Sequence, residues 1–286
     1  MVKRVGTRTR SGTTLVELVT GLSAAVVLLV IAAAVVGAGR GEETASVVGR
    51  DGTHLRQLHQ VMTIFAEDSG GDYPRPGLID RLPVHRDGAE VHLPGVGDED
   101  PSRNTTANLY SALIIQNYFT AELAISPVDR NPNVRLKADY NYDAYDPTED
   151  LYWDATFLAD LETGSNASYA HLALDGERVK LHWRAVAAGP DGPSIPVLGN
   201  RGPVGGEPDW ASVTCSPHGN WSGHLMANDG TMVYTSEVTR EGLEYARGGD
   251  KRLDNVFAIE TGPKGSDVVL SFTRSLGGDG AVLQYD

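Results

Sequence analysis

A glycine and a glutamate near the N-terminus are the pair of residues with the clearest chemical role. Gly12 precedes Thr13, and Glu17 is the fifth residue after Gly12. Cleavage between Gly12 and Thr13 would give Thr13 a free α-amino group, whose positive charge can pair with the Glu17 carboxylate. The pairing would matter inside a membrane, where a carboxylate costs roughly 2.5–3.5 kcal/mol. The alternative is that Glu17 lies at the membrane edge and is simply hydrated.

The residues that follow Glu17 form a long apolar run. Residues 18–39 contain no charged side chain, and a transmembrane helix needs about 20 apolar residues. A secretory signal peptide has a shorter core of about 7–15 residues, with its cleavage site after the core. Here the candidate cleavage site lies before the run. Basic residues flanking such a helix stay in the cytoplasm, so we expect a leader at 1–12, a transmembrane or assembly helix at 13–39, and the remaining chain outside.

This pattern resembles the type IV prepilin and type II secretion pseudopilin superfamily. The shared elements are a short basic leader, Gly12 at the cleavage point, an apolar stretch, and Glu17 at the fifth mature position. The resemblance implies cleavage after Gly12 by a prepilin peptidase, N-methylation of Thr13, and neutralisation of a neighbouring subunit's N-terminus by Glu17. The chain departs from the pattern at Thr13, where the family usually has a large apolar residue.

Composition narrows the functional class. The 286-residue chain carries a formal net charge of −14, and loss of the four basic leader residues would leave the mature chain near −18. This acidic balance argues against nucleic-acid binding, which needs a basic surface. The single cysteine, Cys215, excludes an intrachain disulfide. Many type IV pilins have such a disulfide and pseudopilins commonly lack it, so the resemblance favours a pseudopilin.

A second helical pattern follows the apolar run. Leu55, Leu58, Met62 and Phe65 are spaced as one stripe on a helix, which indicates a face that packs on a globular domain. Gly70, Gly71 and Pro74 end the pattern. We therefore expect the helix to continue through a periplasmic segment at 40–68. If residues 13–68 were one unbroken helix, its length would be roughly 80 Å at 1.5 Å per residue.

Residues 69–286 are expected to form a globular α+β head. Thr105 or Thr106 can cap a helix over 107–118, and the remainder predicts short antiparallel strands. The predicted pairs are 169–174 with 178–183, 224–227 with 231–234, 256–259 with 268–273, and a last pair around 277–280. The segments 125–129, 165–170, 198–203 and 218–230 resemble a group of pilin-like bacterial proteins with an expanded C-terminal head. The predicted fold class is thus a pilin-like α+β fold, with a long N-terminal helix, half transmembrane and half periplasmic, packed on an antiparallel sheet.

The sequence also contains residue types that occur in catalytic and metal-binding sites. Cys215, His218, His224 and Asp229 include zinc-ligand types, but their spacing matches no closed structural site. Residues 98–100 are acidic and could bind calcium, yet they lack the spacing of a calcium loop. No nucleophile elbow, phosphate loop, dinucleotide fingerprint or metalloprotease motif is present. We expect a protein that is not an enzyme, with no catalytic residue, no metal site and no cofactor.

The sequence therefore predicts a structural subunit of a type II secretion pseudopilus or type IV pilus-like filament. The resemblance implies that its partners are a prepilin peptidase, other pilin-like subunits, and an assembly ATPase with its inner-membrane platform; no nucleic acid is expected. The predicted location is the bacterial inner membrane, single-pass, with a cytoplasmic N-terminus and a periplasmic head, before assembly into a periplasmic or surface filament. The alternative is a single-span anchored domain that binds a ligand or partner outside the cytoplasm and never polymerises. In that case the weak helix between Arg40 and Gly52 would be a hinge rather than part of a rod.

Overall fold

The computed structural model describes residues 45–79, 84–86, 88–91, 98–186, 194–207, 220–247 and 249–286. Residues Val48–Asp286 form one compact unit, and Met1–Val47 form another that lies almost wholly outside the described residues. The predicted leader at 1–12 and the predicted helix at 13–39 are therefore outside the described part of the chain.

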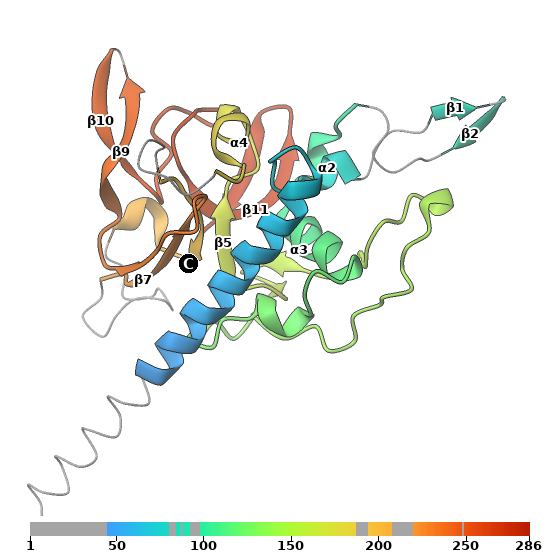
Figure 1. Ribbon diagram of the computed structural model, residues 1–286, viewed down its shortest axis with the longest axis horizontal. Coiled ribbons are helices and arrows are strands. Elements are labelled where there is room, and N and C mark those ends of the chain that lie inside the picture. The colour runs from blue at the N-terminus through green and yellow to red at the C-terminus, as the bar shows by residue number, and fades with distance from the viewer. Residues whose placement is uncertain are drawn as a thin grey trace, which may run out of the picture. The chain divides into compact units, whose positions relative to one another are not determined.

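An amphipathic helix opens the described chain. It covers residues 45–68 and ends before the positive-φ pair Gly70 and Gly71, which supplies the backbone conformation that terminates helices. Leu55, Leu58 and Met62 are at most 2% exposed, whereas Phe65 is half-buried, so three of the four residues of the predicted stripe are buried. In Figure 1 this helix runs, in blue, across the strands of the main sheet.

Six of the described strands form one antiparallel sheet. The strand order is β12-β11-β5-β6-β7-β8. Every residue of the central strands β5, β6 and β7 is buried, whereas the edge strands β8 and β12 are partly exposed. The bounds are β5 Tyr169–Leu172, β6 Pro196–Asn200, β7 Gly223–Ala227, β8 Met232–Thr235, β11 Leu270–Gly277 and β12 Gly280–Gln284.

Smaller elements surround this sheet. Three two-stranded ladders pair β1 with β2, β3 with β4, and β9 with β10 among the described residues. Their bounds are β1 Val84–Arg86, β2 Ala89–Val91, β3 Ala159–Asp160, β4 Gly164–Ser165, β9 Thr239–Arg247 and β10 Asp250–Asn255. The helices are α2 Pro76–Ile79, α3 Thr106–Ile115 and α4 Glu177–His182, with 3-10 turns at Pro101–Arg103, Ala121–Ala124, Pro147–Glu149 and Val204–Gly206.

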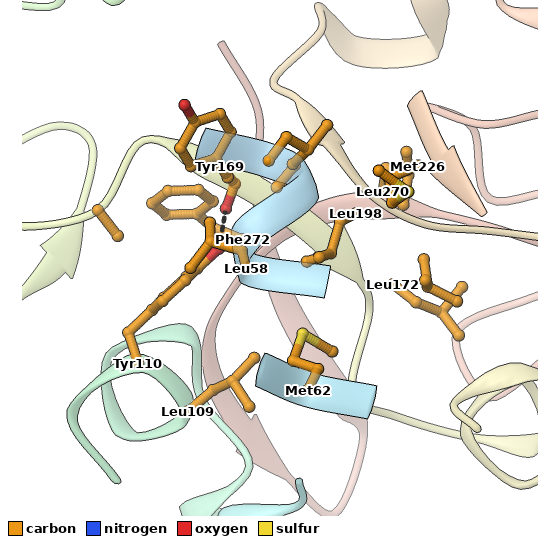
Figure 2. Close-up of a cluster of buried hydrophobic side chains, with 14 of the residues drawn as sticks. Leu58, Met62, Leu109, Tyr110, Tyr169, Leu172, Leu198, Met226, Leu270 and Phe272 are labelled. Atoms are coloured by element: carbon orange, nitrogen blue, oxygen red, sulfur yellow. Dashed lines mark hydrogen bonds between the residues drawn. The ribbon is translucent and has the colours of Figure 1, made fainter. Parts of the chain in front are cut away.

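The main core lies between the 45–68 helix, α3 and the sheet. Figure 2 shows Leu58 and Met62 of the helix facing Leu109 and Tyr110 of α3, with side chains of the central strands beside them. The Tyr110 hydroxyl donates to the Tyr169 carbonyl over 3.0 Å, so the polar end of this buried ring is satisfied. Core packing therefore fixes the face of the helix that contacts the sheet.

Several local predictions are confirmed and others are wrong. Thr105 caps α3 by accepting from the Asn108 N–H, and the predicted hairpin over 224–234 is β7–β8. The turn at 277–280 joins β11 to β12. The predicted strand over 178–183 is wrong because these residues form α4. Residues 256–259 form no strand, so the pair predicted with 268–273 is also wrong.

The predicted fold class must be corrected. In place of a long N-terminal helix packed on a sheet, the described residues hold a short helix over 45–68 and a mostly β body built from antiparallel sheets. The physical reason lies in the helix itself. Charged side chains such as Arg50, Arg56, Glu67 and Asp68 interrupt its sequence, so only one stripe of the helix is apolar.

The predicted location must be corrected as well. Within the described residues, every helix is too short or too polar to cross a bilayer. This finding contradicts the prediction of a single-pass inner-membrane protein with a cytoplasmic N-terminus and a periplasmic head. The prediction depended on the apolar run at 18–39, which lies outside the described residues.

Candidate functional site

A buried carboxylate joins the 45–68 helix to the sheet. Asp51 is 1% exposed, and its side chain accepts hydrogen bonds from three other segments. The Ser126 hydroxyl and the Tyr169 hydroxyl donate to Oδ1, the latter over 3.0 Å, and His224 Nδ1 lies 2.8 Å from Oδ2. Burial raises the pKa of Asp51, but the hydrogen bonds, with that of His224 first, outweigh burial and hold the pKa below its usual value. Asp51 is therefore ionised and fully paired.

A glycine lets the helix come close enough for this pairing. A Cβ atom placed on Gly52 would lie 2.8 Å from His224 Nε2 and 3.1 Å from the Met232 methyl carbon. Any larger residue at position 52 would therefore push the helix away from β7 and β8. Since Nδ1 of His224 faces the Asp51 carboxylate, the helix covers both nitrogens of that ring.

The turn that supplies Ser126 also supplies a buried ion pair. Asp129 binds Arg201 through two bonds, Nη1 to Oδ2 at 2.7 Å and Nη2 to Oδ1 at 3.0 Å. Arg201 is 1% exposed, and its Nη2 also lies 3.4 Å from the side-chain Oδ1 of Asp286. The turn at 126–129 therefore contacts both the helix and the end of β6. We call Asp51, Ser126, Tyr169, His224, Asp129 and Arg201 the polar junction.

A second buried histidine ties α3 to the sheet. His171 on β5 is fully buried, and its Nδ1 lies 2.8 Å from the Leu172 carbonyl oxygen. A carbonyl can only accept, so Nδ1 carries the proton and Nε2 accepts from the Thr106 hydroxyl, 2.7 Å away. Thr106 Oγ1 in turn accepts from the Thr273 N–H at 2.8 Å. Burial lowers the pKa of His171 to about 4, so this ring is neutral at physiological pH.

The polar junction contains the residue types of a hydrolase triad in an order that does not support catalysis. A nucleophilic serine must donate to a histidine base, and the acid must bind the other side of that histidine. Here Ser126 donates to Asp51, and Asp51 lies between Ser126 and His224. Each of the three is at most 6% exposed, so a substrate could not reach them without movement of the helix. The arrangement is suited to fixing the helix on the sheet.

The metal-binding candidates from the sequence are placed only in part. Cys215 and His218 lie outside the described residues. His224 is engaged by Asp51, and Asp229 accepts from the Thr231 N–H within its own turn. In the described part of the chain, no group of three or more His, Cys, Asp or Glu side chains is arranged to hold a metal ion.

The acidic segment at 98–100 has other structural roles. Glu99 binds Arg75 over 2.9 Å and accepts from the Asn104 amide over 2.8 Å. Asp100 accepts from the Ser102 N–H at the start of a 3-10 turn. These contacts account for two of the three carboxylates that suggested calcium.

The residues predicted to act in processing and assembly are not described. Gly12, Thr13 and Glu17 all lie outside the described residues, so the structure does not bring them together with any other group. Asp51 was not among the residues predicted from the sequence, although a pattern identifies it. Asp51 lies four residues before Leu55 and seven before Leu58, which puts a carboxylate on the buried stripe.

Comparison with family models, with curated proteins and with solved structures finds no match for this chain.

Proposed function

We propose that the chain is a structural subunit of a pilus-like filament of the type II secretion pseudopilin or type IV pilin kind, processed after Gly12. The observation that carries this proposal is the order of a basic leader, Gly12, Thr13, Glu17 and the charge-free run at 18–39. Cleavage creates a positive charge at Thr13, and a carboxylate five residues after Gly12 can neutralise the same charge on a neighbouring subunit. The proposed partners are a prepilin peptidase, further pilin-like subunits, and an assembly ATPase with its platform.

The polar junction supports the mechanical part of this proposal. A filament subunit must transmit force between its helix and its head, so the two must not rotate or slide against each other. Asp51 accepts hydrogen bonds from three segments at once. If the helix shifted by one residue, the Asp51 carboxylate would be buried away from these three donors. Leaving a buried charge unpaired costs about 3–5 kcal/mol. The junction therefore fixes one register of the helix on the sheet.

The test of processing is the intact mass and N-terminal sequence of the protein recovered from its own host. We expect a chain that begins at Thr13 and is heavier by one methyl group. Gly12→Asp should block cleavage, whereas Gly6→Asp, a change to the other glycine of the leader, should leave it unaffected. A wild-type chain that still begins at Met1 or Val2 would refute the proposal and favour a binding domain that does not polymerise.

The test of assembly uses Glu17. Glu17→Gln removes the charge and keeps the shape, so cleavage should continue while sedimentable filaments are lost. Glu42→Gln, a change to an acidic residue beyond the apolar run, serves as the matched control and should assemble normally. Equal filament yields from the two variants would remove the proposed role of Glu17.

A further inference from the structure

Exposed apolar side chains concentrate in the segment at 136–158. Thirteen large apolar side chains are exposed among the described residues, and five of these lie in this segment: Leu136, Tyr142, Tyr145, Leu151 and Leu158. The two tyrosines are 47% and 52% exposed. They are three residues apart, so their Cα atoms lie within about 11 Å of each other. Single exposed apolar residues are normal on a protein surface, but a concentration of them indicates an interaction surface.

Each of the two exposed tyrosine rings packs against a buried ring. Tyr142 contacts Tyr140 with ring centroids 4.9 Å apart, and Tyr145 contacts Tyr152 with ring centroids 6.2 Å apart. Tyr140 is 8% exposed and Tyr152 is 3% exposed. Both contacts are edge-to-face, which is a favourable geometry for aromatic pairs. The exposed tyrosines are therefore held in place before any partner binds.

The buried rings are in turn attached to α3. The Tyr140 hydroxyl donates to the Ser111 carbonyl oxygen over 2.7 Å. Tyr152 packs with Ala112 in a small buried cluster. Because Ser111 and Ala112 are consecutive residues of α3, the two ring pairs are fixed to adjacent positions of one helix.

Hydrogen bonds also fix the backbone around the two exposed rings. The Asn141 N–H donates to the carboxylate of Asp154, which is 4% exposed, over 3.0 Å. The Asp143 N–H donates to Asn141 Oδ1 over 3.1 Å. Further along, Asp146 and Leu151 exchange two backbone hydrogen bonds of 2.8 and 3.0 Å, which close the loop between them. An ordered surface of this kind loses little conformational entropy when a partner covers it.

The surroundings of the exposed rings are acidic. The sequence contains no Lys or Arg between Lys137 and Arg178, whereas acidic residues occur at 139, 143, 146, 149, 150 and 154. Lys137 binds Asp139 over 2.8 Å, so one of these charges is balanced. Asp143, which follows Tyr142 directly, is exposed. A partner that approaches the rings therefore meets an excess of negative charge.

We propose that Tyr142, Asp143 and Tyr145, which we call the tyrosine–aspartate surface, bind an arginine-containing basic segment of a partner protein. A guanidinium group stacks on a tyrosine ring and donates two parallel hydrogen bonds to a carboxylate. The formal net charge of −14 also attracts a basic partner. Lysine fits less well, because its ammonium group is more strongly hydrated and forms no bidentate contact. This binding depends on neither processing nor assembly of the chain.

The test measures binding of a short fluorescent peptide of alternating arginine and serine to the full-length chain by anisotropy. Tyr142→Leu/Tyr145→Leu removes both rings but keeps apolar side chains, so the Kd should rise roughly tenfold. Tyr234→Leu, at a tyrosine of β8 that is 54% exposed, is the matched control and should leave the Kd unchanged. Asp143→Asn should raise the Kd roughly threefold, whereas Asp279→Asn, at an exposed aspartate in the β11–β12 turn, should not.

A lysine–serine peptide of the same length and charge separates specific recognition from charge attraction. Weaker binding of this peptide supports the proposal, whereas equal affinity for the two peptides would overturn it. The same Kd for wild type and Tyr142→Leu/Tyr145→Leu would also overturn it. Asp143→Asn keeps the test valid even if the double variant fails to fold, since an unchanged Kd for Asp143→Asn contradicts the bidentate contact.

Two other occupants of the tyrosine–aspartate surface are tested with the same variants. Neutral oligosaccharides are titrated against the chain, and self-association is measured by sedimentation. If the two tyrosines are required for oligosaccharide binding or for self-association, and the arginine peptide does not bind, a basic partner is excluded. Absence of both activities, together with ring-dependent binding of the arginine peptide, supports the proposal.

Discussion

Two glycines of the 45–68 helix allow a paired test of how that helix contacts the sheet. Gly49 and Gly52 are three residues apart, and each weakens a helix by about 1 kcal/mol relative to alanine. Their surroundings differ. A Cβ at Gly49 meets no atom within 4 Å, whereas a Cβ at Gly52 would lie 2.8 Å from His224 Nε2 and 3.1 Å from the Met232 methyl carbon. Helix propensity alone predicts that both alanine substitutions stabilise the protein, but packing predicts opposite signs.

The size of the effect follows from what surrounds His224. Its ring is 6% exposed and is held by Asp51 at Nδ1, so it cannot move aside without loss of that bond. Overpacking a rigid site costs about 1–3 kcal/mol, which exceeds the gain in helix propensity. We expect Gly49→Ala to stabilise the protein by up to about 1 kcal/mol and Gly52→Ala to destabilise it by about 1–2 kcal/mol. For a domain of this size, the two Tm values should differ by roughly 4–10 °C.

The assay is thermal unfolding of the full-length chain, wild type and both variants, followed by circular dichroism at neutral pH. Gly49→Ala serves as the control, because it makes the same chemical change on the same helix without the contact. Equal stabilisation by the two substitutions would show that the helix does not approach His224 as closely as described. The polar junction would then have to be abandoned as the feature that fixes the helix.

Two further predictions concern buried polar groups. Burial lowers the pKa of His171 to about 4, so the stability that this neutral ring contributes is present above pH 6.5 and is lost as pH falls towards 4. Thr106→Val removes the donor to the ring and should destabilise the protein by about 1–3 kcal/mol in urea unfolding. Thr106→Ser keeps the donor and should not destabilise it. Arg201→Met leaves the Asp129 carboxylate buried without its ion partner and should lower the free energy of unfolding by about 3–5 kcal/mol. Lys180→Gln breaks an exposed pair and should lower it by under about 1 kcal/mol. Similar Tm losses for Arg201→Met and Lys180→Gln would contradict the assigned burial.

Local turn and cap chemistry was readable from the sequence. The turn at 228–230 contains Gly230 with a positive φ of 84°, and an aspartate-glycine step between apolar segments is a strong hairpin pattern. Thr105 was one of two possible caps, and its neighbour Thr106 bonds His171 instead. These predictions were correct because each depends on a few adjacent residues.

Tertiary contacts account for the errors. Residues 178–183 alternate between polar and apolar side chains, which predicts a strand, yet they form α4. The sequence could not reveal that Arg178 donates to four carbonyl oxygens and to Asp267, from segments as far as 89 positions away. The hairpin β9–β10 was missed for a related reason. Its strands are rich in charged residues and contain Gly242 at a positive φ, so no apolar alternation marks them.

The use of a charged residue at the centre of the helix–sheet contact has a consequence for the proposed filament subunit. An apolar residue in place of Asp51 could be buried equally well and would carry a smaller desolvation penalty. It would, however, pack at several neighbouring positions on the sheet. Asp51 is satisfied only where Ser126, Tyr169 and His224 converge. The buried carboxylate is therefore less stabilising than an apolar residue, but it specifies one register of the helix on the sheet. A filament repeats its subunit contacts along its length, so a small error in helix position would accumulate from subunit to subunit, and a register fixed by a buried charge limits that error at its source.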